Sequence, residues 1–309
     1  MSATGICEGT WQVPVARSIA EAVRDAEVII VAVPANGHAR IIDAMVPHLA
    51  DGQTVIVSAE LSLSGALLIK EARARGLQIS VISWATTAVT AHSTGLDGVF
   101  VSLLRKKLDI AAMPTRSSVA GQAMCSELFG ISFEIKPNPL AIALSNINAA
   151  GHMAVALCNF TRMERGEDWS SYGGITPGVG ELIERLDEER LALATSYGLE
   201  VRSVVDHYVH SFPVERGSID NMAQAIALTR PHVKGPTSTD TRYVTEDVPF
   251  GLQAMVELAA ITGVAMPLHQ SGIELFSALY GTEFRSQNDI LPRLIRKEET
   301  AEGLQELLR

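Results

Sequence analysis

Several features that define large classes of protein are scarce in this sequence of 309 residues. It has three cysteines, Cys7, Cys125 and Cys158, whose odd number and irregular spacing match neither a disulfide framework nor a metal site. Aromatic residues make up only 5% of the chain, whereas 47% of its residues are hydrophobic. This composition indicates a reducing compartment, no bound metal and a helix-rich or α/β protein with ample material for a core.

Positive charge is also scarce. The formal net charge is −10, and the only tight basic cluster is Arg105-Lys106-Lys107. A nucleic-acid-binding protein normally carries a basic face, so the sequence excludes that class. If the substrates are anions, individual arginines must bind them against the overall negative field.

The N-terminus lacks the marks of a targeting segment. It reads "MSATGICEGTWQVP", with no basic region followed by an apolar one, so it does not resemble a signal peptide. The next apolar run, "VIIVAVPA", is too short to span a bilayer. These features predict a soluble cytoplasmic protein with no membrane partner.

The first 138 residues do contain an alternation of apolar runs and helical patterns. Ser18-Ile-Ala-Glu21 has the capping-box pattern that begins a short helix. "EVIIVAV" is a continuous apolar run ended by Pro34, which is typical of a buried parallel strand. Strands are expected at 27–33, 54–58, 78–83, 99–104, 108–113 and 132–136, with helices at 38–49, 62–75 and 117–129. Strands separated by helices predict a doubly wound, mostly parallel α/β sheet domain.

The character of the chain changes at Pro137-Asn-Pro139. Most of the chain after this point has a helical pattern, at 140–165, 177–197, 201–211, 219–229, 247–263, 267–280 and, in pieces, 288–308. We therefore predict a doubly wound, Rossmann-like α/β domain over residues 1–138 and an all-helical domain over residues 139–309.

This two-domain plan is common among dehydrogenases, yet the motif that would bind a dinucleotide is absent from these residues. G-x-G-x-x-G after a strand places a pyrophosphate on a helix N-terminus. The nearest imitation, Gly178-Val-Gly180, comes after no strand and has Ile183 at the third glycine position.

A polar group interrupts the apolar helical sequence "SNINAAGHMAVAL". Asn148 and His152 are four residues apart on one face of the expected long helix. The small residues of Ala149-Ala150-Gly151 would let another element approach closely. A single histidine on such a helix is commonly a core residue with a satisfied hydrogen bond, but the neighbouring Ser145 and Asn146 make this position polar.

A second polar cluster lies in "TDTRYVTEDVPFG", residues 239–251. Thr245 could cap a helix whose first turn holds Glu246 and Asp247, where the helix dipole favours negative charge. That interpretation does not account for Arg242 and Tyr243, which come just before. The motif is therefore either a helix cap or part of a site.

Together these stretches resemble the octopine/nopaline dehydrogenase family, the opine dehydrogenases. The matching strings are "NINAAGHMAVALCNFTRME", "YGGITPGVGELIERLDEERLALATSYGL", "KGPTSTDTRYVTEDVPFGL" and "ELAAITGVAMP", in the family's order. They cover most of residues 140–280. The N-terminal half is also similar, through "EAVRDAEVIIVAVPANGHARIIDAMVPHLADGQTVIV".

The resemblance implies an NAD(P)-dependent oxidoreductase that joins an amino acid to an α-keto acid and reduces the resulting imine. It implies that His152 is the general acid/base, with Asp247 as its orienting partner. Arg242 would anchor the keto-acid carboxylate, because a guanidinium binds a carboxylate bidentately, and Asn148 would be a secondary polar contact. Val33, Pro34 and Ala35, at the end of a strand, would border NAD or NADP. The helical domain would resemble the C-terminal domain of 6-phosphogluconate dehydrogenase, and the protein would be a homodimer.

The N-terminal half departs from the family pattern. The opening strand, glycine loop, first helix and second strand of such proteins are missing, which is about 30 or more residues. The chain has "SAELSLSG" where the family often has a glycine-rich turn, and "WATTAVTAH" is atypical at its position. We therefore expect a polypeptide of these 309 residues to bind NAD(P)H weakly. We also expect the strand edge beside "EVIIVAV" to be covered by the segment "GTWQVP", by a rearrangement or by a partner chain.

Two alternatives remain open at this point. The chain could be a truncated, non-catalytic binding or assembly protein that keeps the fold. It could instead be another two-domain NAD(P)-dependent ketoacid reductase, although such enzymes normally have a lysine in the central helix, and "SNINAAGHMAVAL" has none.

Overall fold

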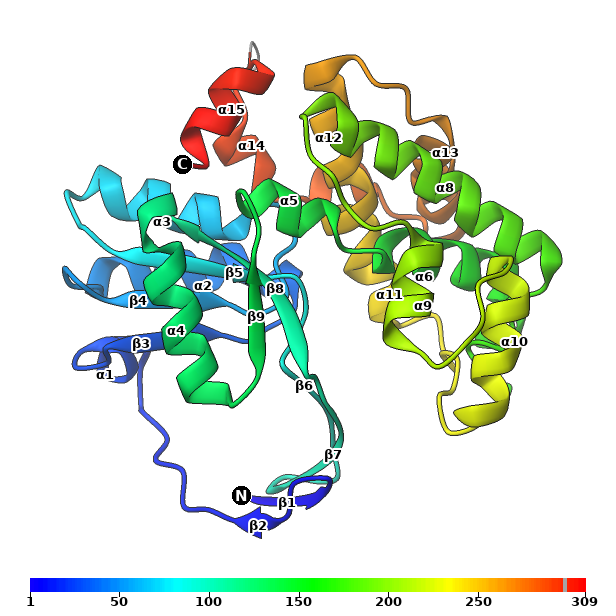
Figure 1. Ribbon diagram of the computed structural model, residues 1–309, viewed down its shortest axis with the longest axis horizontal. Coiled ribbons are helices and arrows are strands. Elements are labelled where there is room, and N and C mark those ends of the chain that lie inside the picture. The colour runs from blue at the N-terminus through cyan, green and yellow to red at the C-terminus, as the bar shows by residue number, and fades with distance from the viewer. Residues whose placement is uncertain (297–298) are drawn as a thin grey trace. The chain divides into compact units, whose positions relative to one another are not determined.

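Five strands of the N-terminal half pair into one sheet in the order β3-β4-β5-β8-β9 (Figure 1). They are β3 (Val28–Val31), β4 (Thr54–Val57), β5 (Ser80–Trp84), β8 (Lys107–Met113) and β9 (Ser132–Ile135). β3, β4 and β5 are parallel, β8 runs antiparallel to β5, and β9 is parallel to β8. The sheet confirms the predicted Rossmann-like α/β class, in which most neighbouring strands are parallel.

The structure is a computed structural model, and it describes residues 1–296 and 299–309. Contacts divide the chain into two units: Met1–Ala143 with Leu304–Arg309, and Leu144–Gly303. The first unit holds helices α1 (Ile19–Val23), α2 (His38–Met45), α3 (Ser64–Ala74) and α4 (Ser118–Phe129). Helix α5 (Pro139–Leu144) ends at the division, and α15 (Ala301–Leu307) crosses it.

The core of the first unit lies where α3 and α4 pack on the central strands. Ile56, Ile82 and Ile110, from β4, β5 and β8, are completely buried. The Trp84 ring packs edge-on against Phe129, with 4.9 Å between the ring centroids. Apolar runs with helical segments between them therefore produce the expected layered core.

Helix α1 begins as its sequence predicts. The Ser18 Oγ accepts a hydrogen bond from the Glu21 backbone N–H at 3.2 Å. The Glu21 carboxylate accepts from the backbone N–H of Arg17 rather than from that of Ser18, at 2.9 Å. Both side chains thus accept hydrogen bonds from backbone N–H groups at the N-terminus of α1. In a capping box the Glu21 carboxylate would bind the N–H of the N-cap residue, Ser18, but here it binds that of the residue before it.

The first strand of the main sheet is less buried than predicted. β3 lies at the edge of the sheet, and its Ile30 is 45% exposed, whereas Val55 and Ile56 of the neighbouring β4 are fully buried. The prediction of a buried strand at 27–33 was therefore wrong in this respect. A continuous apolar run does not by itself distinguish a central strand from an edge strand.

The N-terminal segment does not cover this edge. β1 (Ser2–Gly5), β2 (Gly9–Thr10), β6 (Val89–Ser93) and β7 (Gly98–Leu104) form a second sheet in the order β2-β1-β7-β6 (Figure 1). The "GTWQVP" segment thus contributes β2 to this small sheet, and the run at 99–104 pairs there instead of in the main sheet. Over residues 1–296 and 299–309, no strand pairs with the outer side of β3. Of the three alternatives expected for that edge, covering by "GTWQVP" was wrong, and covering by a partner chain stays a prediction.

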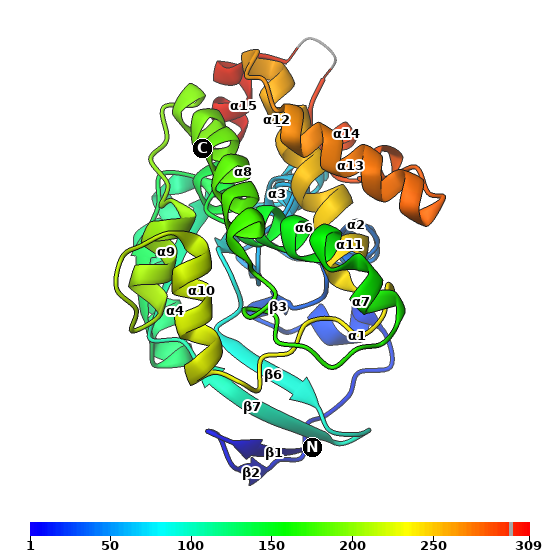
Figure 2. The same cartoon turned by 90° about the vertical axis from the view of Figure 1, so that its right-hand side faces the viewer.

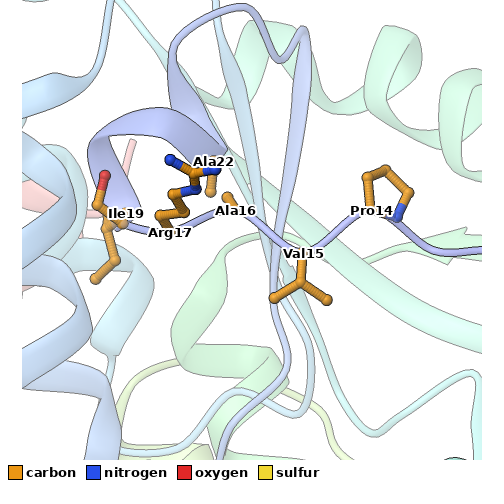
Figure 3. A pocket seen from close by; sticks show the side chains of 7 residues that line it. Pro14, Val15, Ala16, Arg17, Ile19 and Ala22 are labelled. Carbon is orange, nitrogen blue, oxygen red and sulfur yellow. The ribbon is translucent and has the colours of Figure 1, made fainter.

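A short connection joins the small sheet to α1. It lines an open pocket formed by Pro14, Val15, Ala16, Arg17, Ser18, Ile19 and Ala22 (Figure 3). None of the predicted site residues lines this pocket. It belongs to the connection and the first turn of α1.

The second unit is helical. Its helices are α6 (Asn148–Cys158), α7 (Phe160–Glu164), α8 (Pro177–Ser196), α9 (Val204–Ser211), α10 (Ile219–Thr229), α11 (Arg242–Thr245), α12 (Gln253–Thr262), α13 (Pro267–Tyr280) and α14 (Leu291–Leu294). The longest, α8, contacts α6, α9, α10, α12 and α13 (Figure 2). This confirms the predicted helical C-terminal region.

The predicted long helix at 140–165 is broken. Residues 145–147 separate α5 from α6, and Asn159 separates α6 from α7. At the first break the Asn146 side-chain oxygen accepts a hydrogen bond from the Asn148 backbone N–H at 2.8 Å. Asparagine side chains compete in this way with the helical hydrogen bonds, so the polar residues that suggested a site also end the helix.

Residues Pro139–Cys158 are the one described stretch long and apolar enough to cross a membrane by length and composition. In the structure this stretch is interrupted at 145–147, and 67% of its apolar window is buried. Core helices of soluble proteins meet the same criterion. The stretch is therefore only weak support for a membrane span.

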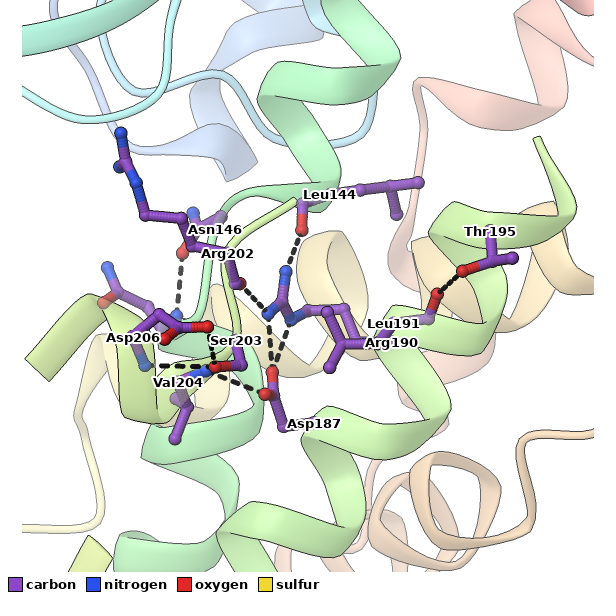
Figure 4. Close-up of polar contacts among 11 residues, drawn as sticks. Leu144, Asn146, Asp187, Arg190, Leu191, Thr195, Arg202, Ser203, Val204 and Asp206 are labelled. Carbon is purple, nitrogen blue, oxygen red and sulfur yellow. Dashed lines mark hydrogen bonds and ion pairs between the residues drawn. The ribbon is translucent and has the colours of Figure 1, made fainter. Parts of the chain in front are cut away.

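A buried ion pair on α8 binds the end of α5 (Figure 4). The Arg190 guanidinium donates to Asp187 at 2.6 and 2.8 Å, to the Arg202 carbonyl at 2.6 Å and to the Leu144 carbonyl. The second carboxylate oxygen of Asp187 accepts from the Val204 backbone N–H at 2.7 Å. The Arg190–Asp187 pair thus links α8 to the end of α5 and to the beginning of α9.

A carboxylate from α8 also caps α13. Glu189 accepts hydrogen bonds from the backbone N–H groups of Leu268 and His269, at 2.9 and 3.2 Å, and from the His269 ring at 2.7 Å. Burial raises the pKa of Glu189, but these hydrogen bonds outweigh it and leave the pKa below its ordinary value. A charged carboxylate at a helix N-terminus satisfies N–H groups that have no partner within the helix.

Replacing Glu189 with glutamine is expected to lower the free energy of unfolding by about 1–3 kcal/mol at neutral pH. Because the folded pKa of Glu189 is depressed, its contribution is present above the unfolded pKa and is lost as pH falls through the folded value. Urea unfolding between pH 7 and about pH 3 should show wild type and variant converging below a pH of about 4.3. A constant difference across that range would contradict this assignment. Glu188→Gln, on the exposed face of α8, is the control and should change little.

Candidate functional site

The centre of the candidate site is a contact between two residues that are far apart in the sequence. The His152 Nδ1 lies 2.7 Å from the Asp247 Oδ2. The aspartate side chain is 6% exposed and the histidine side chain 18% exposed. The predicted contact is confirmed, and both residues belong to the helical unit. The His152 Nε2 makes no hydrogen bond to any residue in 1–296 or 299–309.

The local structure of the motif around Asp247 differs from the predicted helix cap. Thr241, not Thr245, caps α11, since its side chain accepts from the Tyr243 backbone N–H at 3.3 Å. Thr245 lies inside the helix, and its hydroxyl donates to the Thr241 carbonyl at 3.1 Å. The prediction failed because two threonines four residues apart can each begin a helix. The earlier start places Tyr243 and Asp247 four residues apart, on one face.

Asp247 is followed by one turn of π-helix, Val248–Leu252. Such turns are rare and occur frequently at functional sites. Gly251, within this turn, approaches α6 so closely that a Cβ there would lie 2.6 Å from the Ala149 Cβ. The small residues of α6 therefore permit the close approach predicted from the sequence, and that approach brings Asp247 to His152.

Tyr243 is a site residue to which the sequence analysis gave no role. Its ring lies parallel to the His152 ring, with 3.6 Å between centroids and 6° between planes. Burial raises the pKa of the Tyr243 phenol and Asp247 raises it further, while a hydrogen bond with Ser171 and the charge of Arg242 lower it. The clue in the sequence was the spacing of four residues between Tyr243 and Asp247. This spacing places the two side chains on one face only if the helix begins after Thr241 and not after Thr245.

The two predicted substrate-binding residues lie close in sequence to the histidine–aspartate pair. Arg242 is the first residue of α11, adjacent to Tyr243, and it is exposed. Within the described residues it forms no ion pair. Asn148 begins α6, one turn before His152, and is partly exposed. Its side-chain amide has no hydrogen bond to a described residue.

The predicted cofactor residues lie in the other unit, after β3. Val33 and Pro34 are exposed, and Ala35 is buried in a short 3-10 turn. The Val33 carbonyl lies 2.9 Å from the Nε2 of the buried His38. They occupy the carboxyl end of a parallel strand, where ligands bind in open α/β sheets.

A buried carboxylate behind this turn was also missed. Glu60 accepts hydrogen bonds from the hydroxyls of Ser64 and Ser83 and from the Gly65 N–H, at 2.8, 2.6 and 3.0 Å. The Ser64 hydroxyl lies 2.8 Å from the His38 Nδ1, which continues the network to Val33. Three non-glycine residues beside it, Ala59, Ser62 and Leu63, have positive φ. "SAELSLSG" thus builds a tight polar turn where the sequence lacks glycines.

No group of three or more histidine, cysteine, aspartate or glutamate side chains in the described part of the chain is arranged to hold a metal ion. The helical unit offers the histidine–aspartate pair, the stacked phenol and the nearby arginine. A histidine held by a carboxylate can transfer protons near neutral pH.

Comparison with known proteins connects this site to a family. Residues 135–280 match the family model for NAD/NADP octopine/nopaline dehydrogenase, alpha-helical domain. An opine dehydrogenase of Arthrobacter sp. (strain 1C) is 32% identical over 288 residues, which cover 92% of this chain and 79% of that protein.

Solved structures share the fold. Octopine dehydrogenase with NADH and L-arginine has a TM-score of 0.73 at 16% identity, covering 86% of this chain and 72% of that one. Apo yersinopine dehydrogenase has a TM-score of 0.74 at 17% identity, covering 100% of this chain and 86% of that one. At these identities the likeness concerns the fold alone.

Proposed function

Because the chain belongs to the opine dehydrogenase family, we propose that it catalyses the reductive condensation of an amino acid with an α-keto acid. The amine of the amino acid condenses with the keto group and releases water, and reduction of the imine gives a secondary amine that carries two carboxylates. The observation that carries the proposal is the 2.7 Å contact between the His152 Nδ1 and Asp247.

In this proposal His152 moves the proton at the reacting carbon–nitrogen or carbon–oxygen centre. A carboxylate only accepts hydrogen bonds, so Asp247 fixes the imidazole with its proton on Nδ1 and leaves Nε2 for the substrate. The absence of a described partner on Nε2 supports this assignment.

Arg242 is proposed to bind the keto-acid carboxylate. Arg242 is exposed and lies one residue from Tyr243, and its guanidinium offers two parallel N–H donors to a carboxylate. The unbonded side-chain amide of Asn148, on the same helix as His152, would contact the substrate as a second polar group.

We assign cofactor binding to residues 1–138 and the substrate site to residues 139–309. NAD or NADP, when bound, supplies the hydride for the reduction. The exposed apolar surface of Val33 and Pro34 at the carboxyl end of β3 fits the flat face of such a cofactor, with Ala35 in the turn behind them. We further propose that the protein is a cytoplasmic homodimer, and light scattering on the purified protein tests the oligomeric state.

Two experiments test the proposal. Fluorescence titration with NADH and NADPH detects cofactor binding, which a purely structural assembly protein would lack. NADH or NADPH oxidation is then followed with keto acids and amino acids singly and in pairs, using both the 309-residue polypeptide and the longest in-frame product of the gene. Oxidation should require both substrates. Oxidation with a keto acid alone would instead favour a ketoacid reductase.

Arg242→Ala is expected to raise KM for the keto acid about 10-fold or more, because it removes a charge-assisted contact of about 1.5–3 kcal/mol. The value of kcat should change less, since the reacting atoms keep their partners. Arg216→Ala is a suitable control, because Arg216 is exposed and pairs with Asp206 on another helix. A KM unchanged in Arg242→Ala would remove this residue from the site.

A further inference from the structure

The stack between Tyr243 and His152 differs from the other ring contacts of the described residues. The remaining aromatic pairs are T-shaped or tilted, with centroids 4.9–6.3 Å apart. Aromatic pairs generally prefer such edge-on or offset arrangements over full overlap. The parallel overlap at 3.6 Å therefore indicates that both rings are held in place by other contacts.

Those contacts are present on each ring. Asp247 holds the imidazole in its own plane through Nδ1, and Tyr243 covers one face of it. The phenol is hydrogen-bonded to Ser171, outside α11, while the Tyr243 backbone is fixed by the Thr241 cap. An in-plane bond and a facial contact together restrict both the rotation and the tilt of the imidazole.

The chemical character of the Tyr243 phenol suits a position against the His152 ring. Because burial raises its pKa, the phenol is neutral, and it offers the electron-rich face of its ring to the imidazole. Such a face attracts a cation. When His152 takes up a proton, the stack therefore stabilises the charged ring without adding a competing base.

We propose that Tyr243 is a positioning residue that holds the His152 ring in the plane in which Nδ1 meets Asp247 and Nε2 is directed at the substrate. The inference rests on the proposed function of His152. Ser171 anchors the phenol from the segment before α8 and so takes part in the same positioning.

Nuclear magnetic resonance of the histidine ring protons tests the stack without any need for turnover. A ring stacked on a tyrosine face has its proton signals moved upfield by the aromatic ring current. The His152 signals, assigned by their loss in His152→Gln, should be upfield in wild type and in Tyr243→Phe, and should return to ordinary positions in Tyr243→Leu. Ordinary positions in wild type would overturn the inference, as would unchanged signals in Tyr243→Leu.

Kinetics test the consequence in the active form of the protein. Tyr243→Leu should lower kcat by about 10–10²-fold with a small change in KM, because a misplaced catalytic group costs rate rather than affinity. Tyr243→Phe, which keeps the ring, should remain within about 3-fold of wild type, and Ser171→Ala should match it. Wild-type kcat in Tyr243→Leu would overturn the inference.

These results separate the inference from the function on which it rests. Wild-type activity in His152→Gln would contradict the proposed function, whatever the Tyr243 variants do. Loss of activity in His152→Gln with full activity in Tyr243→Leu would contradict only the positioning role. If Tyr243→Leu does not fold, the His152 signals of wild type still decide, because ordinary positions there would overturn the inference and upfield positions would support it.

Discussion

Replacing His152 with alanine is expected to lower kcat by about 10²–10⁴-fold, the usual contribution of a positioned general acid/base. The variant loses the group that moves the proton and leaves Asp247, which is 6% exposed, without its partner. Because substrate binding is assigned to Arg242 and Asn148, KM should change much less than kcat. Steady-state oxidation of NADH with both substrates present measures the two constants.

The control for this experiment is another histidine of the same unit. His210, on α9, is exposed, so His210→Ala should keep wild-type constants. Asp247→Asn should also lower kcat, as His152→Ala does, because an amide can present either a donor or an acceptor to Nδ1 and no longer fixes the tautomer. Wild-type kcat in His152→Ala would refute the proposed mechanism.

Replacing Arg190 with methionine is expected to lower the free energy of unfolding of the helical unit by about 3–5 kcal/mol. Arg190 is completely buried, and its loss leaves the Asp187 carboxylate without a counter-charge (Figure 4). The carbonyls of Leu144 and Arg202 lose their donor at the same time. Urea or thermal unfolding measures the effect.

Two further variants make this prediction specific. Arg190→Met combined with Asp187→Leu should recover part of the loss, because removing both charges of a buried pair is far less costly than removing one. Arg185→Met, on the same helix, breaks only exposed pairs with Glu181 and Glu188 and should change the stability little. Equal losses in Arg185→Met and Arg190→Met would contradict this account of the buried pair.

The parts of the fold that could be predicted from the sequence are those set by local pattern. Apolar runs and turn residues indicated the strands of the main sheet, and the helical period indicated α8, α10 and α13 close to their observed ends. Helix α4 stops before Gly130, whose positive φ of 65° ends it as expected. These elements are fixed by residues close to one another in the chain.

The features that were missed depend on distant partners. An apolar run could not show that β3 lies at an edge, because that depends on which strands pair with it. The sequence pattern around His152 did not show that Asn146 would end the preceding helix through its side chain. In the site, the resemblance located His152 and Asp247, but the stack of Tyr243 depended on which threonine capped α11.

The most direct test of the central claim is the identity of the product. The protein is incubated with NADH or NADPH, an α-keto acid and an amino acid, and the products are analysed by mass spectrometry. Our account predicts a secondary amine whose mass equals that of the two substrates less one water and plus two hydrogens, formed by wild type and strongly reduced in His152→Ala. A hydroxy acid from the keto acid alone, or equal amounts of amine from wild type and His152→Ala, would contradict it.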